Sequence, residues 1–360
     1  MRRPCHAHAS RVTCRICHMP YCCRLVLVIA ALMTSASAAS GQVPFETAGT
    51  RALGMAGAFV AVADDASATY WNPAGLPGIR FFDGSIELGR LESEGPGSGR
   101  TPDTAGWRAE TTRFAVATPV LAFTYARFSV AGTATASPGG DGQGLEDAAP
   151  ARTLQAQHFG ITLVQSVGDA LVVGSTLRFV RAGAAAGTVD ADVGVREAVR
   201  QIAQQDVSSK NHFDADVGVL GWIGRLRLGL VVRNATAPTL DLPGGGTWEI
   251  ERQVRAGASI GGEPARGQRP WAVALDADLT TTALPDGRRR SLAAGGERWW
   301  GDRRVALRAG ARMQTIDGPR PAVSGGASLA LRAGLLIEAQ GTRGGDRRDR
   351  GWGLTARLTF

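Results

Sequence analysis

Alternation of apolar and polar residues, in blocks of about ten separated by turn residues, most constrains how this chain folds. The C-terminal block is the clearest. Its polar positions are Thr355, Arg357 and Thr359. They alternate with the apolar positions Trp352, Leu354, Ala356, Leu358 and Phe360. Successive side chains of a β-strand point to opposite faces, so such a block predicts a strand with one apolar and one polar face. After residue 80, no apolar segment approaches the roughly 18 residues that a membrane-spanning helix needs.

The blocks predict about fourteen strands, joined by short turns and by long polar connections. Their expected ranges are 81–92, 107–118, 121–133, 152–167, 170–184, 208–222, 225–238, 248–261, 269–282, 289–300, 303–316, 320–332, 334–343 and 350–360. Outer-membrane barrels of single bacterial chains have an even number of antiparallel strands, short periplasmic turns and longer outer loops. We therefore predict an all-β protein, a transmembrane antiparallel β-barrel spanning residues 81–360.

The N-terminus predicts export and so favours a membrane barrel over a soluble β-sandwich, which would also alternate. Arg24 precedes a short apolar run at 25–33, and small residues follow to Ala36-Ser37-Ala38. This is the pattern of a secretory signal peptide, assigned here to residues 1–38, with Met19 as an alternative start. We expect the mature protein to reside in the bacterial outer membrane as a monomer in contact with its lipid.

Residue chemistry argues against an enzyme. All five cysteines lie in the leader, including a Cys14–His18 match to the haem-attachment pattern that would be removed with it, so no cofactor is expected. Only His158 and His212 follow the leader, and no G-x-S-x-G motif is present. Three Asp-Ala-Asp sequences, at 190–192, 214–216 and 276–278, lie in no loop with the ligand spacing of an EF-hand, which favours salt bridges over a metal site. The net charge of +8 is spread along the chain, so no nucleic-acid partner is expected.

Residues 39–80 depart from the strand pattern. Gly54 and Gly57 permit close approach of the backbone, and Asn72-Pro73-Ala74-Gly75 is strong turn chemistry. A barrel of fourteen strands has a lumen wide enough to need filling. We therefore predict that this segment is a plug, or hatch, inside the barrel.

The glycine-rich stretch, the 63–68 sequence Ala-Asp-Asp-Ala-Ser-Ala, the aromatic pair and the Asn-Pro-Ala-Gly sequence together resemble the N-terminal hatch of FadL-type outer-membrane transporters, a superfamily that includes PorV/PorQ-like proteins. The resemblance assigns the hatch motif to Asn72, Pro73, Ala74 and Gly75. The C-terminal strand resembles the signal that the outer-membrane assembly machinery reads, and this assigns that role to Trp352, Leu358 and Phe360.

The resemblance implies hatch-gated transport of a small hydrophobic or amphipathic ligand, such as a fatty acid or hydrocarbon. A PorV-like barrel that anchors or hands on secreted partner proteins is the alternative. Fatty-acid transporters of this type have helical third and fourth outer loops. Here the third has one candidate helix, Val195–Gln204, and the fourth, 239–247, is short, which moves the chain toward the PorV-like members.

The polar faces of the predicted strands place charged side chains in the lumen. The candidates are Arg178, Arg227, Arg233, Arg308, Arg312, Arg357, Asp276 and Asp278. They could form a path for an anionic headgroup, because arginine offers a bidentate fork to a carboxylate. The favoured alternative is that opposite charges pair across neighbouring strands.

Tryptophans at the ends of the predicted strands suggest two interfacial girdles. Amphipathic rings prefer the membrane–water interface, so these side chains are expected to point outward. The residues are Trp222, Trp271, Trp299 and Trp300 near the short turns, and Trp107, Trp248 and Trp352 near the long loops.

Overall fold

The computed structural model describes residues 43–94, 106–133, 148–190, 195–241, 247–262, 270–284, 287–345 and 349–360. They all belong to one compact unit, Ala39–Phe360. The predicted signal peptide and its cysteines lie outside the described residues, so the 1–38, 39–80 and 81–360 division stays a prediction.

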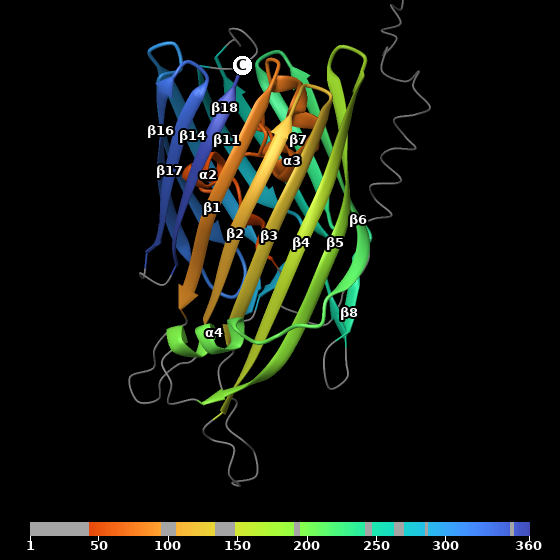
Figure 1. The fold of residues 1–360 in the computed structure, drawn as a ribbon. Helices are drawn as coiled ribbons and strands as arrows, with labels where there is room; N and C mark the ends of the chain where they lie inside the picture. The colour runs from red at the N-terminus through yellow and green to blue at the C-terminus, as the bar shows by residue number, and fades with distance from the viewer. Residues whose placement is uncertain are drawn as a thin grey trace, which may run out of the picture. The chain divides into compact units, whose positions relative to one another are not determined.

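Fourteen antiparallel strands close into a barrel, which confirms the predicted fold class (Figure 1). The barrel strands are β1 (Asp83–Glu94), β2 (Gly106–Ala117), β3 (Leu121–Thr133), β4 (Ala148–Val167), β5 (Leu171–Asp190), β6 (Lys210–Ile223), β7 (Leu226–Arg233), β10 (Gln253–Gly261), β11 (Trp271–Asp278), β14 (Ser291–Trp300), β15 (Val305–Gln314), β16 (Pro321–Arg332), β17 (Leu335–Gly344) and β18 (Arg350–Thr359). Pairing of β1 with β18, from Asp83 opposite Thr359 to Glu92 opposite Arg350, closes the ring. Closure leaves the fourteen barrel strands without an unpaired edge, as a lipid environment requires.

The connections differ at the two ends of the barrel. The C-terminus and the short turns, such as 168–170 and 301–304, lie at one end, which we call the turn end. The other end, the loop end, carries α4 (Val195–Ala203) and two small hairpins. The hairpins are β8 (Thr239–Asp241) with β9 (Thr247–Glu249), and β12 (Thr282–Leu284) with β13 (Gly287–Arg289).

Two neighbouring strands are longer than the sequence predicts. The β4–β5 ladder runs without a shift from Val167 opposite Leu171 to Ala148 opposite Asp190. At about 3.4 Å per residue, 20 residues extend to roughly 65 Å, well beyond an apolar band about 25 Å tall. The far part of this hairpin therefore extends the wall at the loop end. There Ala149 and Ala151 of β4 and Val189 of β5, together with Ala131 of β3, pack against α4.

The strand faces alternate as the sequence predicts. In β15, Leu307 is 55% exposed on the outer face, whereas the next residue, Arg308, is 5% exposed on the inner face. No helix among the described residues is long and apolar enough to cross a membrane.

The girdle hypothesis is wrong for three tryptophans. Trp107, Trp248 and Trp299 are almost fully buried, while Trp271, Trp300 and Trp352 have exposed side chains. Trp107 and Trp299 share the inward parity of their strands, and Trp248 belongs to a hairpin folded against the inner wall. Position at a strand end therefore did not decide orientation, because the period-2 alternation fixes which face each residue occupies.

The hatch occupies the lumen in four short turns of helix, of which α2 and α3 are labelled in Figure 1. They are η1 (Phe45–Thr47), α2 (Thr50–Gly54), α3 (Ala68–Trp71) and η2 (Pro73–Gly78). Its apolar side chains, among them Phe45, Phe59 and Trp71, join inward-facing alanines of the barrel in one core. This confirms the hatch within the predicted fold class.

Candidate functional site: the contact between hatch and wall

Asn72 ties the hatch to itself and to the barrel. Its side chain is fully buried, and its Nδ2 donates to the backbone oxygens of Val60 at 3.0 Å and Val219 at 3.1 Å. Its Oδ1 accepts from the Ala74 amide at 3.1 Å, which caps the turn that begins with Pro73. Proline suits this first position because its missing N–H would have no helical partner. Asn72 thus links two hatch segments and strand β6 through one amide.

Glycines in the wall make room for this motif. A Cβ at Gly174 of β5 would overlap the backbone of Pro73, and one at Gly218 of β6 would overlap the Asn72 side chain. Beside them, Ala74 packs against Val172 and Leu220. The contact between the motif and the wall is therefore close-packed, and any larger residue at these glycines would displace the hatch.

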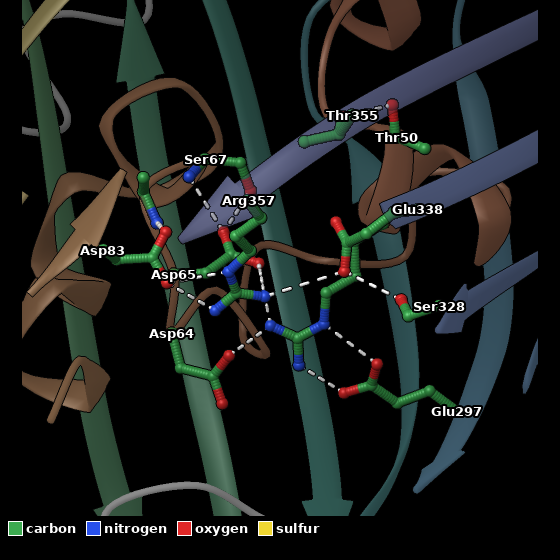
Figure 2. Close-up of polar contacts among 12 residues, drawn as sticks. Thr50, Asp64, Asp65, Ser67, Asp83, Glu297, Ser328, Glu338, Thr355 and Arg357 are labelled. Atoms are coloured by element: carbon green, nitrogen blue, oxygen red, sulfur yellow. Dashed lines mark hydrogen bonds and ion pairs between the residues drawn. The ribbon is translucent and has the colours of Figure 1, made fainter. Parts of the chain in front are cut away.

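Arg51 is the centre of an ionic network between hatch and wall, and its partners Asp64, Asp65 and Glu297 are labelled in Figure 2. Its Nη1 contacts Asp64 and lies 2.9 Å from Asp65, both in the hatch. Its Nε donates to Glu297 of β14 at 2.9 Å. All four side chains are buried, so each charge depends on the others for compensation.

Arg357 of β18 and Arg308 of β15 extend this network. Arg357 lies 2.6 Å from Asp83 and 3.5 Å from Asp65 (Figure 2). Arg308 lies 3.0 Å from Glu297. Burial acts to raise the pKa of Asp65, but Arg357 and Arg51 outweigh it and hold that pKa well below its usual range. The hatch carboxylate is therefore an ion in its docked position.

A second ionic group lies around Arg255 of β10. Its guanidinium contacts Glu46 of the hatch, lies 2.6 Å from Asp278, and covers the Phe45 ring at 4.2 Å. Burial acts to raise the pKa of Glu46, but Arg255 and Arg312 lower it to about 2. Nearby, Asp276 accepts from the amides of Phe59 and Val60 at 2.8 Å each, so the wall also holds hatch backbone.

The remaining candidate charges lie in separate places on the inner wall. Arg178 pairs with Asp214 and, at 2.8 Å, with Asp216. Arg233 lies over the Tyr70 ring at 3.7 Å, and Arg227 lies over Trp222 at 5.6 Å.

Arg312 lies 3.7 Å from Asp349, just after the 346–348 segment between β17 and β18. The eight candidates therefore do not gather into one line of like charge. They are divided among ion pairs and contacts with the hatch. This arrangement agrees better with pairing of opposite charges on the inner wall than with a path for an anionic headgroup.

Sequence reasoning missed Arg51, Arg255 and Glu297. A signal for Arg51 was present, because it is the only basic residue between 43 and 79 and that segment holds three acids. Arg255 and Glu297 were detectable only as inward positions of their strands. The C-terminal residues Trp352, Leu358 and Phe360 lie on the outer face with exposed side chains, and their role in assembly stays a prediction.

An apolar cluster fills the lumen on the loop side of the hatch. It joins the wall residues Leu91, Val130 and Leu154 to both small hairpins through Leu240, Trp248 and Leu284, and Val43 of the hatch packs against it. Among the described residues, no group of three His, Cys, Asp or Glu side chains is placed to hold a metal ion. The lumen thus holds a packed apolar cluster on the loop side of the hatch and buried ion pairs between the hatch and the wall.

Comparison with known proteins places this arrangement in a structural class. The sequence model of a family described as F plasmid transfer operon, TraF, protein matches residues 152–278, less than half of the chain. No curated protein matches the sequence.

Several solved structures are similar in fold. The CymD monoaromatic hydrocarbon channel is 14% identical, with a TM-score of 0.59 over 88% of this chain and 98% of that one. The toluene transporter TbuX of Ralstonia pickettii is 15% identical, with a TM-score of 0.58 over 88% and 99%. A FadL homologue of Pseudomonas aeruginosa is 15% identical, with a TM-score of 0.57 over 89% and 100%. The chain therefore has the fold of these proteins.

Proposed function

We propose that this protein is a FadL-superfamily channel of the bacterial outer membrane that passes small hydrophobic or amphipathic molecules, with the hatch as its gate. The observation that carries the proposal is the position of the hatch: it fills the lumen and is fastened to the wall by Arg51, Arg357 and Asn72. The similar structures include a monoaromatic hydrocarbon channel and a toluene transporter, which supports the same class of cargo.

The apolar cluster on the loop side favours hydrophobic cargo over sugars or ions. Side chains such as Trp107, Leu154 and Trp248 are buried in this cluster, so a molecule that enters from the loop end must replace contacts among them before it reaches the hatch. An apolar molecule can take over such contacts, whereas a sugar or an ion would lose its hydration there without gaining polar partners. A PorV-like anchoring role stays an alternative from sequence, and the chain's described surface offers no observation that favours it.

Transport requires the hatch to move or to leave a path beside it. Thr50 of the hatch and Thr355 of β18 are joined by a hydrogen bond of 2.8 Å between their hydroxyls (Figure 2). Because the predicted mature chain has no cysteine, a Thr50→Cys, Thr355→Cys variant would introduce its only two thiols. Their oxidation would lock the hatch to the wall, since the two side chains already touch.

The experiment uses the mature protein in liposomes whose outer leaflet is lipopolysaccharide, which slows passive entry of apolar solutes. It measures entry of toluene and, as a polar control, of glucose, each corrected for entry into protein-free liposomes. We expect toluene flux through the reduced variant and at least a tenfold loss on oxidation, with little glucose flux in either state. The two single-cysteine variants control for oxidation itself. Absence of toluene flux through wild-type protein would refute the function, whereas equal flux in both redox states would refute only the gating by the hatch.

A further inference from the structure

A large cavity opens at the turn end of the barrel. Its volume is about 820 Å³, within the range of small-molecule sites. Five arginines line it: Arg80, Arg303, Arg304, Arg332 and Arg357. They are far apart in sequence, but β14 to β18 and β1 are successive neighbours in the barrel, so their ends meet at one stretch of the rim.

The cavity is electropositive. Among the described residues that line it, Asp302 is the single acid. Burial, together with the positive charges of Arg51 and Arg357, lowers the pKa of Arg303 to about 10 against the opposing effect of Asp64. Burial is the largest cause, so the charge of Arg303 is poorly solvated, and a bound anion would help to compensate it.

The inner wall of the cavity adds a neutral donor. Trp299 is 95% buried, and its ring lies 4.0 Å beneath the Arg303 guanidinium. No acceptor in the described part of the chain meets its indole Nε1. Buried N–H groups nearly always have a partner, so this donor indicates an acceptor that the protein does not supply.

Apolar side chains on the membrane-facing side complete the lining. Trp300, Leu331 and Phe360 line the cavity and are exposed on the outer face of the barrel. The cavity thus opens where lipid headgroups adjoin acyl chains. Guanidinium groups match phosphate oxygens in a bidentate fork, and basic pockets at membrane surfaces bind anionic headgroups.

We propose that this cavity binds the phosphate headgroup of an anionic phospholipid of the inner leaflet. Arg304 and Arg332 meet the phosphate, the Trp299 indole donates to an oxygen, and the acyl chains follow Leu331 and Phe360 along the outer wall. This site is independent of the proposed transport and requires only that the barrel is inserted in a bilayer.

The test is lipid binding to the folded mature protein in detergent, measured by native mass spectrometry with phosphatidylglycerol and phosphatidylethanolamine. The variant Arg80→Gln, Arg304→Gln, Arg332→Gln changes three exposed residues of the rim. At about fivefold per basic residue, we expect the loss of three arginines to lower phosphatidylglycerol affinity by at least about tenfold. The matched control, Arg196→Gln with Arg200→Gln on α4 at the loop end, should bind as wild type. Trp299→Phe keeps a ring but removes the donor, and it should weaken binding severalfold.

Heat-modifiable gel migration checks that each variant folds, and the three single substitutions replace the triple variant if it does not. Wild-type affinity in all these rim variants would overturn the site. Equal binding of the zwitterionic lipid would overturn the requirement for an anion. Displacement of phosphatidylglycerol by an equal concentration of soluble glycerol phosphate would show a site for free phosphate and overturn the assignment to lipid.

Discussion

Replacing Arg51 with glutamine removes a buried cation that contacts both hatch acids, Asp64 and Asp65, and the barrel carboxylate Glu297. Asp64, Asp65 and Glu297 remain buried, but Asp65 keeps Arg357 and Glu297 keeps Arg308. Breaking a buried ion pair costs about 3–5 kcal/mol. Because two of the three carboxylates retain a second arginine, we expect a cost at the lower end of this range, about 3 kcal/mol. At 1.4 kcal/mol per factor of ten, this cost raises the population of molecules with an open hatch about a hundredfold.

Amide hydrogen exchange measures this population directly. The amides of Gly57, Ala63 and Trp71 donate within the hatch, so they exchange when it opens. We expect their exchange rates to rise about a hundredfold in Arg51→Gln, while amides of the barrel strands keep their wild-type rates.

Two further variants make the result specific. Arg200→Gln removes an exposed arginine paired with Glu197 and should leave hatch exchange unchanged. Adding Asp64→Asn to Arg51→Gln removes the carboxylate that has lost its ion-pair partner and should recover part of the loss. Wild-type exchange rates at the hatch amides of a folded Arg51→Gln protein would refute the claim that the network fastens the hatch.

Other perturbations test the same contact from different sides. Gly218→Ala should destabilise the docked hatch by about 1–3 kcal/mol, because the added Cβ would overlap the Asn72 side chain. Gly341→Ala is the control: its added Cβ meets nothing within 4 Å, so the exchange rates of the hatch amides should not change. Asn72→Ala leaves two backbone carbonyls without its amide, so it should destabilise the docked hatch by about 1–3 kcal/mol and raise toluene flux in liposomes. The pKa of Glu46 is lowered from 4.5 to about 2, so the stability that its carboxylate gives to the docked hatch is fully present above pH 4.5 and is lost as the pH falls toward 2. The near-ultraviolet circular dichroism of the hatch aromatic residues should therefore stay constant from pH 7 to about pH 5 and decline below pH 4. Arg255→Gln removes the partner of Glu46 and should move that decline to higher pH, and an unmoved transition would show that another group controls it.

Sequence alone determined the architecture. Alternation is a local property of the backbone, so it assigned the faces of β15 and β18, and counting its blocks led to a closed barrel of fourteen strands. The Asn-Pro-Ala-Gly sequence marked the hatch because turn chemistry is also local. The inward arginines followed from the same alternation.

Only the tertiary structure decided which groups meet inside. Arg51 and Glu297 are 246 residues apart, and their contact depends on strand register, barrel closure and the depth of the hatch together. The same is true of Gly218 beneath Asn72, of the tryptophans that face inward, and of the arginines that gather at the rim. Alternation says which face a side chain occupies, but not what lies across the lumen from it.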